Sequence, residues 1–214
     1  MTEKFPESCV SCETFHRKIN LLLNPYDVSI DIESAEKLVS FWNFFSHWNK
    51  AHNLSSVTDL EEATFIHFAD SLFPASEKEI FLKEKRVLDF GTGGGFPGIP
   101  LSLYFKDCQF FLLDKCRKKT SFISFAAASL GVKNVFPVNA LLEKHKGTKY
   151  DIITSRAVKI DKKMFDLCRS ILNEDGWLII YYSLSQKPVE SEFLSHVREY
   201  DLGNRKRFVA YYHF

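Results

Sequence analysis

The sequence lacks several features that would assign it at once to a class of protein. No uninterrupted apolar run approaches the roughly 20 residues of a membrane-spanning helix, and the first residues, Met-Thr-Glu-Lys-Phe-Pro, do not form a signal peptide. Its 28 basic and 27 acidic residues give a formal net charge of +1, which argues neither for nor against a nucleic-acid partner. We therefore expect a cytoplasmic protein without a membrane partner.

Cysteine is scarce, and the five cysteines form no evident disulfide framework, which suits a reducing compartment. Cys9 and Cys12, followed by His16, have the spacing of half a zinc site or of a redox pair. Because no second such pair follows, we expect no metal site and interpret the two thiols as incidental.

Glycine is also sparse, except that five of the nine glycines lie between Gly91 and Gly98. The surrounding stretch, residues 86–100, reads Arg-Val-Leu-Asp-Phe-Gly-Thr-Gly-Gly-Gly-Phe-Pro-Gly-Ile-Pro. It begins as a short buried strand and passes into a sharp turn, where glycine permits positive φ and lets a ligand lie against bare backbone. Residues 99–105 are typical of a helix start, whose free N–H groups attract negative charge. Strand, glycine turn and helix form the first unit of a doubly wound α/β nucleotide-binding fold.

Two binding motifs overlap in this turn. A Gly-x-Gly-x-x-Gly pattern that starts at Gly93 fits the dinucleotide fingerprint, but a lone fingerprint is weak evidence. Asp89-x-Gly91-x-Gly93-x-Gly95 fits the acidic-glycine motif of S-adenosylmethionine-dependent methyltransferases equally well. We favour the second, because it places a glycine directly after the strand and gives Asp89 a role in holding the turn amides or facing the ammonium group of methionine. The dinucleotide alternative puts Pro97 where the pyrophosphate needs an N–H.

The order of predicted elements gives the domain organisation. Residues 1–82 are typical of helices, expected at 14–23, at about 35–49 and at 59–73, and form a helical extension before one globular unit over 83–214. From Arg86 onwards strands and helices alternate as in βαβ units. Beyond the first strand, strands are expected at 109–113, 134–138, 150–154, 177–182 and 208–212, the last in an antiparallel edge hairpin, with helices at 117–130 and 164–172. The second strand ends at Asp114, where an acidic side chain holds the ribose hydroxyls of a nucleoside.

Several motifs occur in the order found in one known family. The sequence resembles the bacterial small-subunit ribosomal RNA guanine-N7 methyltransferases, RsmG or GidB, from about Asn49 to Val158 and more loosely to the C-terminus. The motifs that carry the resemblance are residues 49–57, His-Phe-Ala-Asp-Ser at 67–71, residues 89–102 with their Gly-Phe-Pro-Gly-Ile-Pro, Leu-Leu-Asp at 112–114 and Ser-Arg-Ala at 155–157. The resemblance implies an α/β, Rossmann-like, seven-stranded methyltransferase fold with an N-terminal helical extension. It also implies S-adenosyl-L-methionine as cofactor and 16S rRNA, or a small ribosomal subunit precursor, as partner. We expect the protein to be a monomer.

The resemblance adds site residues to those of the glycine motif. The cofactor-binding residues we predict are Asp89, Gly91, Gly93, Gly95, Phe96, Asp114, Leu142, Glu143 and Arg156. Leu141 stands where the family usually has arginine, and Ser183-Leu184 where it usually has Lys-Gly, so substrate contacts are expected to differ. For Arg156 a structural ion pair is an equally good interpretation.

The substrate side is less well defined by the sequence. Asn53 is either a turn residue or a substrate contact, and His67 either contacts substrate or forms an inconsequential pair with Asp70. No catalytic base is predicted, because guanine N7 carries a free lone pair. Arg117, Lys118 and Lys119 are candidates for RNA phosphate contacts, with residues 205–207 as a second basic cluster. A small-molecule methyltransferase and a non-catalytic nucleotide-binding protein stay open as alternatives.

Overall fold

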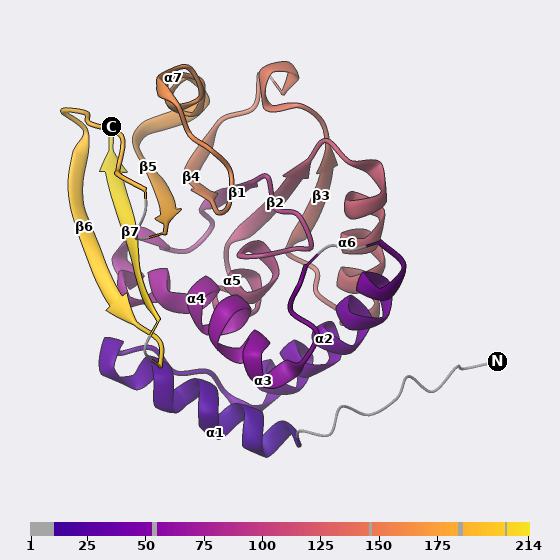
Figure 1. Cartoon of the computed structure of the whole chain (residues 1–214). Helices are drawn as coiled ribbons and strands as arrows, with labels where there is room; N and C mark the ends of the chain where they lie inside the picture. Colours follow the sequence, from indigo (N-terminus) through magenta and orange to yellow (C-terminus); the bar gives the residue numbers. More distant parts are fainter. Residues whose placement is uncertain (1–10, 53–54, 146, 184–185, 204) are drawn as a thin grey trace.

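The computed structural model describes residues 11–52, 55–145, 147–183, 186–203 and 205–214. Its centre is a seven-stranded sheet in the order β3-β2-β1-β4-β5-β7-β6, shown in Figure 1. The first five strands run parallel, and the last two join antiparallel. The strands are β1 (Arg86–Phe90), β2 (Gln109–Asp114), β3 (Val135–Asn139), β4 (Tyr150–Ser155), β5 (Leu172–Tyr182), β6 (Leu194–Asp201) and β7 (Lys206–His213).

Different helices cover the two faces of the sheet. Successive residues of each strand point to opposite faces, so neighbouring strand residues belong to different cores. Val87 belongs to the core under the N-terminal helices, and its neighbour Leu88 to the core around α7. The first core includes α1 (Cys12–Leu23), α2 (Ile32–His52), α5 (Gly98–Tyr104) and α6 (Arg117–Ser129); the second includes α7 (Lys162–Ser170) and the short η5 (Leu142–Lys144). The N-terminal helices thus belong to the core on one face of the sheet, where α2 packs against α5 and α6 (Figure 1).

The segment between α2 and β1 contains several short helical pieces. Asp59 caps α3 (Leu60–Ala63), since its carboxylate accepts the Glu62 N–H at 2.8 Å, as the sequence predicts. The helix then widens into the π-helical η2 (Thr64–Ala69), returns to α4 (Asp70–Leu72), and ends as η3 (Phe73–Ser76). The helix predicted over 59–73 is therefore present, but it contains a π-helical turn, with His67 in it, that was not predicted. η4 (Lys78–Ile80) completes this segment, and η1 (Asn24–Tyr26) lies earlier, between α1 and α2.

The C-terminal hairpin is confirmed, with one difference from the expectation. The last strand, β7, lies between β5 and β6, so β6 forms the edge of the sheet. β6 was not predicted from the sequence, because only Tyr200 of its eight residues is buried and the apolar alternation of a strand is weak. Within the described part of the chain, every helix is too short or too polar to cross a bilayer.

Candidate functional site

The glycine loop after β1 has the conformation that its sequence predicts. Gly91, Gly93 and Gly95 all have positive φ, at +72°, +59° and +96°. A side chain at Gly91 would collide with Val158, and one at Gly94 would collide with Phe45 of α2. At Gly93 the nearest atom to an added Cβ would be 3.9 Å away, so this glycine faces open space. Neighbouring elements therefore need the close approach at Gly91 and Gly94, whereas Gly93 leaves bare backbone for a ligand.

Asp89, near the end of β1, stabilises the conformation of this loop. Its side chain is fully buried at the end of β1, where Oδ2 accepts the Gly98 N–H at 2.8 Å and Oδ1 accepts the Thr154 hydroxyl at 3.3 Å. Burial raises the pKa of Asp89 to about 6. The expected role in holding a turn amide is seen directly, whereas a contact between Asp89 and a ligand stays a prediction, because the carboxylate has no exposed surface.

Asp114 lies at the carboxyl end of the neighbouring strand and faces the same loop. Its Oδ2 accepts the Gly93 N–H at 3.1 Å, and its Oδ1 accepts the Cys116 N–H at 2.8 Å. Lys119 Nζ lies 3.7 Å from Oδ2. The structure therefore brings Gly93 and Asp114 together, as expected for a nucleoside site at the carboxyl ends of parallel strands.

Residues after β3 complete this edge of the sheet. Leu142 and Glu143 begin η5, with Leu142 buried in the second core and Glu143 exposed to solvent. Asn139 connects the end of β3 to β2, because its Nδ2 donates to the Asp114 carbonyl at 3.0 Å. Leu141, which stands where the family usually has arginine, is 41% exposed and supplies no charge. Contact of Leu142 and Glu143 with a cofactor stays a prediction.

Arg156 and Asp70 form a buried ion pair beside the glycine loop. Arg156 Nη1 lies 2.8 Å from Asp70 Oδ2 and also donates to the Ile66 carbonyl at 3.1 Å. Asp70 Oδ1 accepts the Tyr200 hydroxyl at 2.7 Å. The Arg156 guanidinium lies 5.4 Å from the centre of the Phe96 ring, so it also contacts the loop itself. The structural interpretation of Arg156 is thus supported, and a ligand role is compatible with it.

His67 lies in the same cluster as a neutral group. Its ring stacks on Phe96, with centroids 4.6 Å apart, and its Nε2 is 3.0 Å from the Ser55 hydroxyl. Burial, with a smaller contribution from Arg156, lowers the pKa of His67 to about 3. His67 therefore pairs with Ser55 and Phe96, and the expectation of a surface pair with Asp70 is wrong because Asp70 pairs with Arg156.

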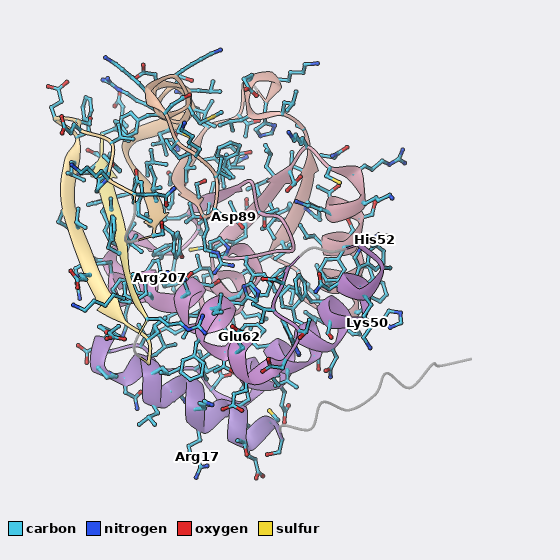
Figure 2. All side chains as sticks on the ribbon, in the orientation of Figure 1. Arg17, Lys50, His52, Glu62, Asp89 and Arg207 are labelled. Carbon is cyan, nitrogen blue, oxygen red and sulfur yellow. The ribbon has the colours of Figure 1, made fainter. Side chains whose placement is uncertain are left out.

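A cavity of about 280 Å³ opens next to these residues. It lies between the π-helical turn and the ends of β4, β5 and β7, and it is lined by Ile66, His67, Asp70, Arg156, Ala157, Tyr181, Tyr182, Ser183, Gln186 and Arg207. Phe96 contacts both His67 and Arg156 from the loop side, so the glycine loop and the cavity adjoin. The side chains around Asp89 in Figure 2 show how closely the loop, the N-terminal helices and the strand ends pack.

Some predicted residues do not join this site. Asn53, Leu184 and Cys9 lie outside the described residues. His16 Nε2 donates a 2.9 Å hydrogen bond to the Ile30 carbonyl, which gives it a structural role, and the described His, Cys, Asp and Glu residues form no cluster that could hold a metal. Tyr200 was not predicted from the sequence, because nothing in its local pattern indicates a hydrogen bond to Asp70.

The fold defines the class of protein. Similar solved structures include a variant of MtNAS, with a TM-score of 0.55, 14% identity and coverage of 92% of this chain and 81% of that chain. Another is coclaurine N-methyltransferase, solved with N-methylheliamine and SAH, with a TM-score of 0.51, 16% identity and coverage of 80% and 51%. These similarities show the fold, which is the Rossmann-like seven-stranded fold of S-adenosylmethionine-dependent methyltransferases.

Sequence comparison then gives the family. The GidB family model, described as rRNA small subunit methyltransferase G, matches residues 34–202. The Ribosomal RNA small subunit methyltransferase G of Actinobacillus pleuropneumoniae serotype 5b (strain L20) is 36% identical over 176 residues, which is 82% of this chain and 82% of that protein. The chain belongs to the GidB family, and the resemblance found in its sequence motifs is confirmed.

Proposed function

We propose that this protein is an S-adenosyl-L-methionine-dependent methyltransferase that modifies N7 of a guanine in 16S rRNA. The single observation that carries the proposal is the glycine loop, in which the open Gly93 backbone lies beside the Asp114 carboxylate and Phe96 contacts Arg156, a lining residue of the cavity. Membership of a family described as small-subunit rRNA methyltransferases supports the substrate class. The choice of N7 rests on the family resemblance and on the chemistry of the residues around the cavity.

The residues present fit the cofactor. Gly93 has room above its backbone for a ligand, and Asp114 offers a carboxylate to ribose hydroxyls at the same place. S-adenosylmethionine, when bound, supplies a methyl group attached to a positively charged sulfur. Asp89 and Thr154 hold the loop in shape, and Phe96 of the loop contacts His67 at the cavity that would receive the base.

The neutral state of His67 agrees with chemistry that needs no general base. Guanine N7 carries a lone pair and no proton, so it forms the new N–C bond as the methyl–sulfur bond breaks, and the positive charge passes from sulfur to the purine ring. No proton leaves N7 in this step. An imidazole with a pKa of about 3 is unprotonated at neutral pH, and therefore adds no positive charge beside a product that is itself cationic. Residues of this chain contribute by alignment and by excluding water.

The cellular setting follows from the substrate. We propose that the protein acts in the cytoplasm as a monomer, on a small ribosomal subunit or its precursor, with residues 1–82 as a helical extension to the methyltransferase unit at 83–214. The packing of α2 against the glycine loop supports a role for this extension in shaping the site, since Phe41 and Phe45 of α2 contact Phe96.

Labelled methyl transfer tests the proposal. Small ribosomal subunits, large subunits and free nucleosides, all from cells that lack the modification, are each incubated with the protein and methyl-labelled S-adenosylmethionine. We expect label only in small-subunit rRNA. Label in nucleosides would favour a small-molecule methyltransferase, and cofactor binding in calorimetry without any transfer would favour a non-catalytic protein.

A further inference from the structure

The two basic clusters of the sequence differ in their ion pairing. In the cluster at the start of β7, Arg205 Nη2 lies 3.3 Å from Glu62 Oε1, and Lys206 Nζ lies 3.2 Å from Glu199 Oε1. Arg207 Nε lies 4.0 Å from Asp70 Oδ1. Each cation of this cluster therefore has a carboxylate partner, and the charge that it offers to a nucleic acid is largely compensated.

The cluster at the start of α6 is different. Lys119 turns inward to Asp114, but Lys115, Arg117 and Lys118 are exposed and form no ion pair with the described residues. The first turn of α6 also contains no acidic residue. Cations at a helix N-terminus oppose the helix dipole, so Arg117 and Lys118 do not stand there for the stability of α6.

Helix α2 brings a further uncompensated cation to the same place. Phe44 contacts Phe125, with centroids 5.3 Å apart, and Trp48 contacts Phe122 at 5.4 Å. The later residue of α2 thus contacts the earlier residue of α6, so the two helices run antiparallel. The last turn of α2 therefore lies beside the first turn of α6. Lys50 belongs to that last turn, is exposed, and forms no ion pair with the described residues. Figure 2 shows Lys50 and His52 at this end of α2.

We propose that Lys50, Lys115, Arg117 and Lys118, which we call the α2–α6 surface, bind phosphates of the rRNA strand that leads to the target base. The inference rests on the proposed function. Lys115 directly follows Asp114, which faces the glycine loop, so a strand on this surface passes the edge of the cofactor site. The surface is suited to bind RNA phosphates, because it presents four exposed cations that form no ion pair with the described residues.

Salt dependence distinguishes this surface from an ordinary solvated one. Each phosphate contact adds about 0.7–0.9 to the slope of log affinity against log salt. The test variant is Arg117→Gln/Lys118→Gln, and its control is Arg205→Gln/Lys206→Gln, which removes the same charge from the paired cluster. Affinity for unmodified small ribosomal subunits is measured at several salt concentrations, together with S-adenosylmethionine affinity and thermal unfolding.

We expect the slope of the test variant to fall by about 1.4–1.8, and by about a further 0.7–0.9 when Lys50→Gln is added. The control should keep the wild-type slope to within one contact, and all variants should bind S-adenosylmethionine normally. Superimposable salt curves for test variant and wild type, or an equal loss in the control, would overturn the inference. If the salt curves superimpose but the wild-type protein still methylates small subunits, this inference fails and the proposed function stands. If the wild-type protein transfers no methyl group, the proposed function itself is contradicted.

Discussion

Removing the carboxylate of Asp70 should destabilise the protein far more than removing a surface charge. Asp70 is 6% exposed and accepts hydrogen bonds from two groups that are distant in the sequence, Arg156 at 2.8 Å and Tyr200 at 2.7 Å. The Arg156 side chain is itself only 14% exposed. Without Asp70, its guanidinium would remain buried with carbonyl oxygens and the Phe96 ring as its remaining partners.

The magnitude follows from this burial. Breaking a buried ion pair by deleting one partner costs about 3–5 kcal/mol, because it leaves an uncompensated charge. We therefore expect Asp70→Ala to lower the free energy of unfolding by about 3–5 kcal/mol, a large part of the roughly 5–15 kcal/mol of a typical domain. Tyr200→Phe removes only a hydrogen bond to a charged group and should cost about 1.5–3 kcal/mol.

Urea unfolding of a double-mutant cycle measures the coupling directly. The cycle combines Asp70→Ala and Arg156→Ala, singly and together, and the control is Glu199→Gln, which breaks an exposed pair with Lys206 worth about 0–1 kcal/mol. We expect the double variant to be much less unstable than the sum of the singles. Additive losses, or a loss for Asp70→Ala as small as that of the control, would refute the assignment of a buried, coupled pair.

Three further predictions concern the loop, the ribose contact and pH. Gly93→Ala should weaken S-adenosylmethionine binding in calorimetry, whereas Gly131→Ala, which has a similar φ of +64° and open space around it, should cost similar stability and leave binding unchanged; equal affinities would remove Gly93 from the cofactor site. Asp114→Ala should weaken cofactor binding by about 1.5–3 kcal/mol, and unchanged affinity would mean that another group holds the ribose. Because the pKa of His67 is lowered to about 3, its contribution to stability is full above pH 6.5 and is lost as the pH falls towards 3. The stability difference between wild type and His67→Gln should therefore shrink across that window, and a pH-independent difference would contradict a buried neutral imidazole.

Local patterns in the sequence predicted the conformation of the glycine loop well. Asp89 and Gly98 are only nine residues apart, and the strand, turn and helix between them leave few alternatives for the loop. The parallel strands and the antiparallel hairpin also followed from local signals, because buried strands are rich in apolar residues. The edge strand β6 was missed for the opposite reason, since most of its side chains face solvent.

The contacts around the cavity could not be predicted in the same way. Asp70 meets Arg156 from 86 positions away and Tyr200 from 130 positions away, and these contacts depend on how the π-helical turn packs against the sheet. A His-x-x-Asp spacing indicates only that two side chains share a helical face. In the folded protein the two side chains have different partners: His67 stacks on Phe96, and Asp70 forms an ion pair with Arg156.

The nucleoside formed in the reaction tests the central claim most directly. Small ribosomal subunits from cells that lack the modification are incubated with the protein and S-adenosylmethionine, and their rRNA is digested to nucleosides for mass spectrometry. The account predicts 7-methylguanosine in the 16S rRNA, in amounts that depend on the protein and on the cofactor. Methylation of a different atom or base, or the absence of any new methylated nucleoside while the protein binds its cofactor, would contradict it.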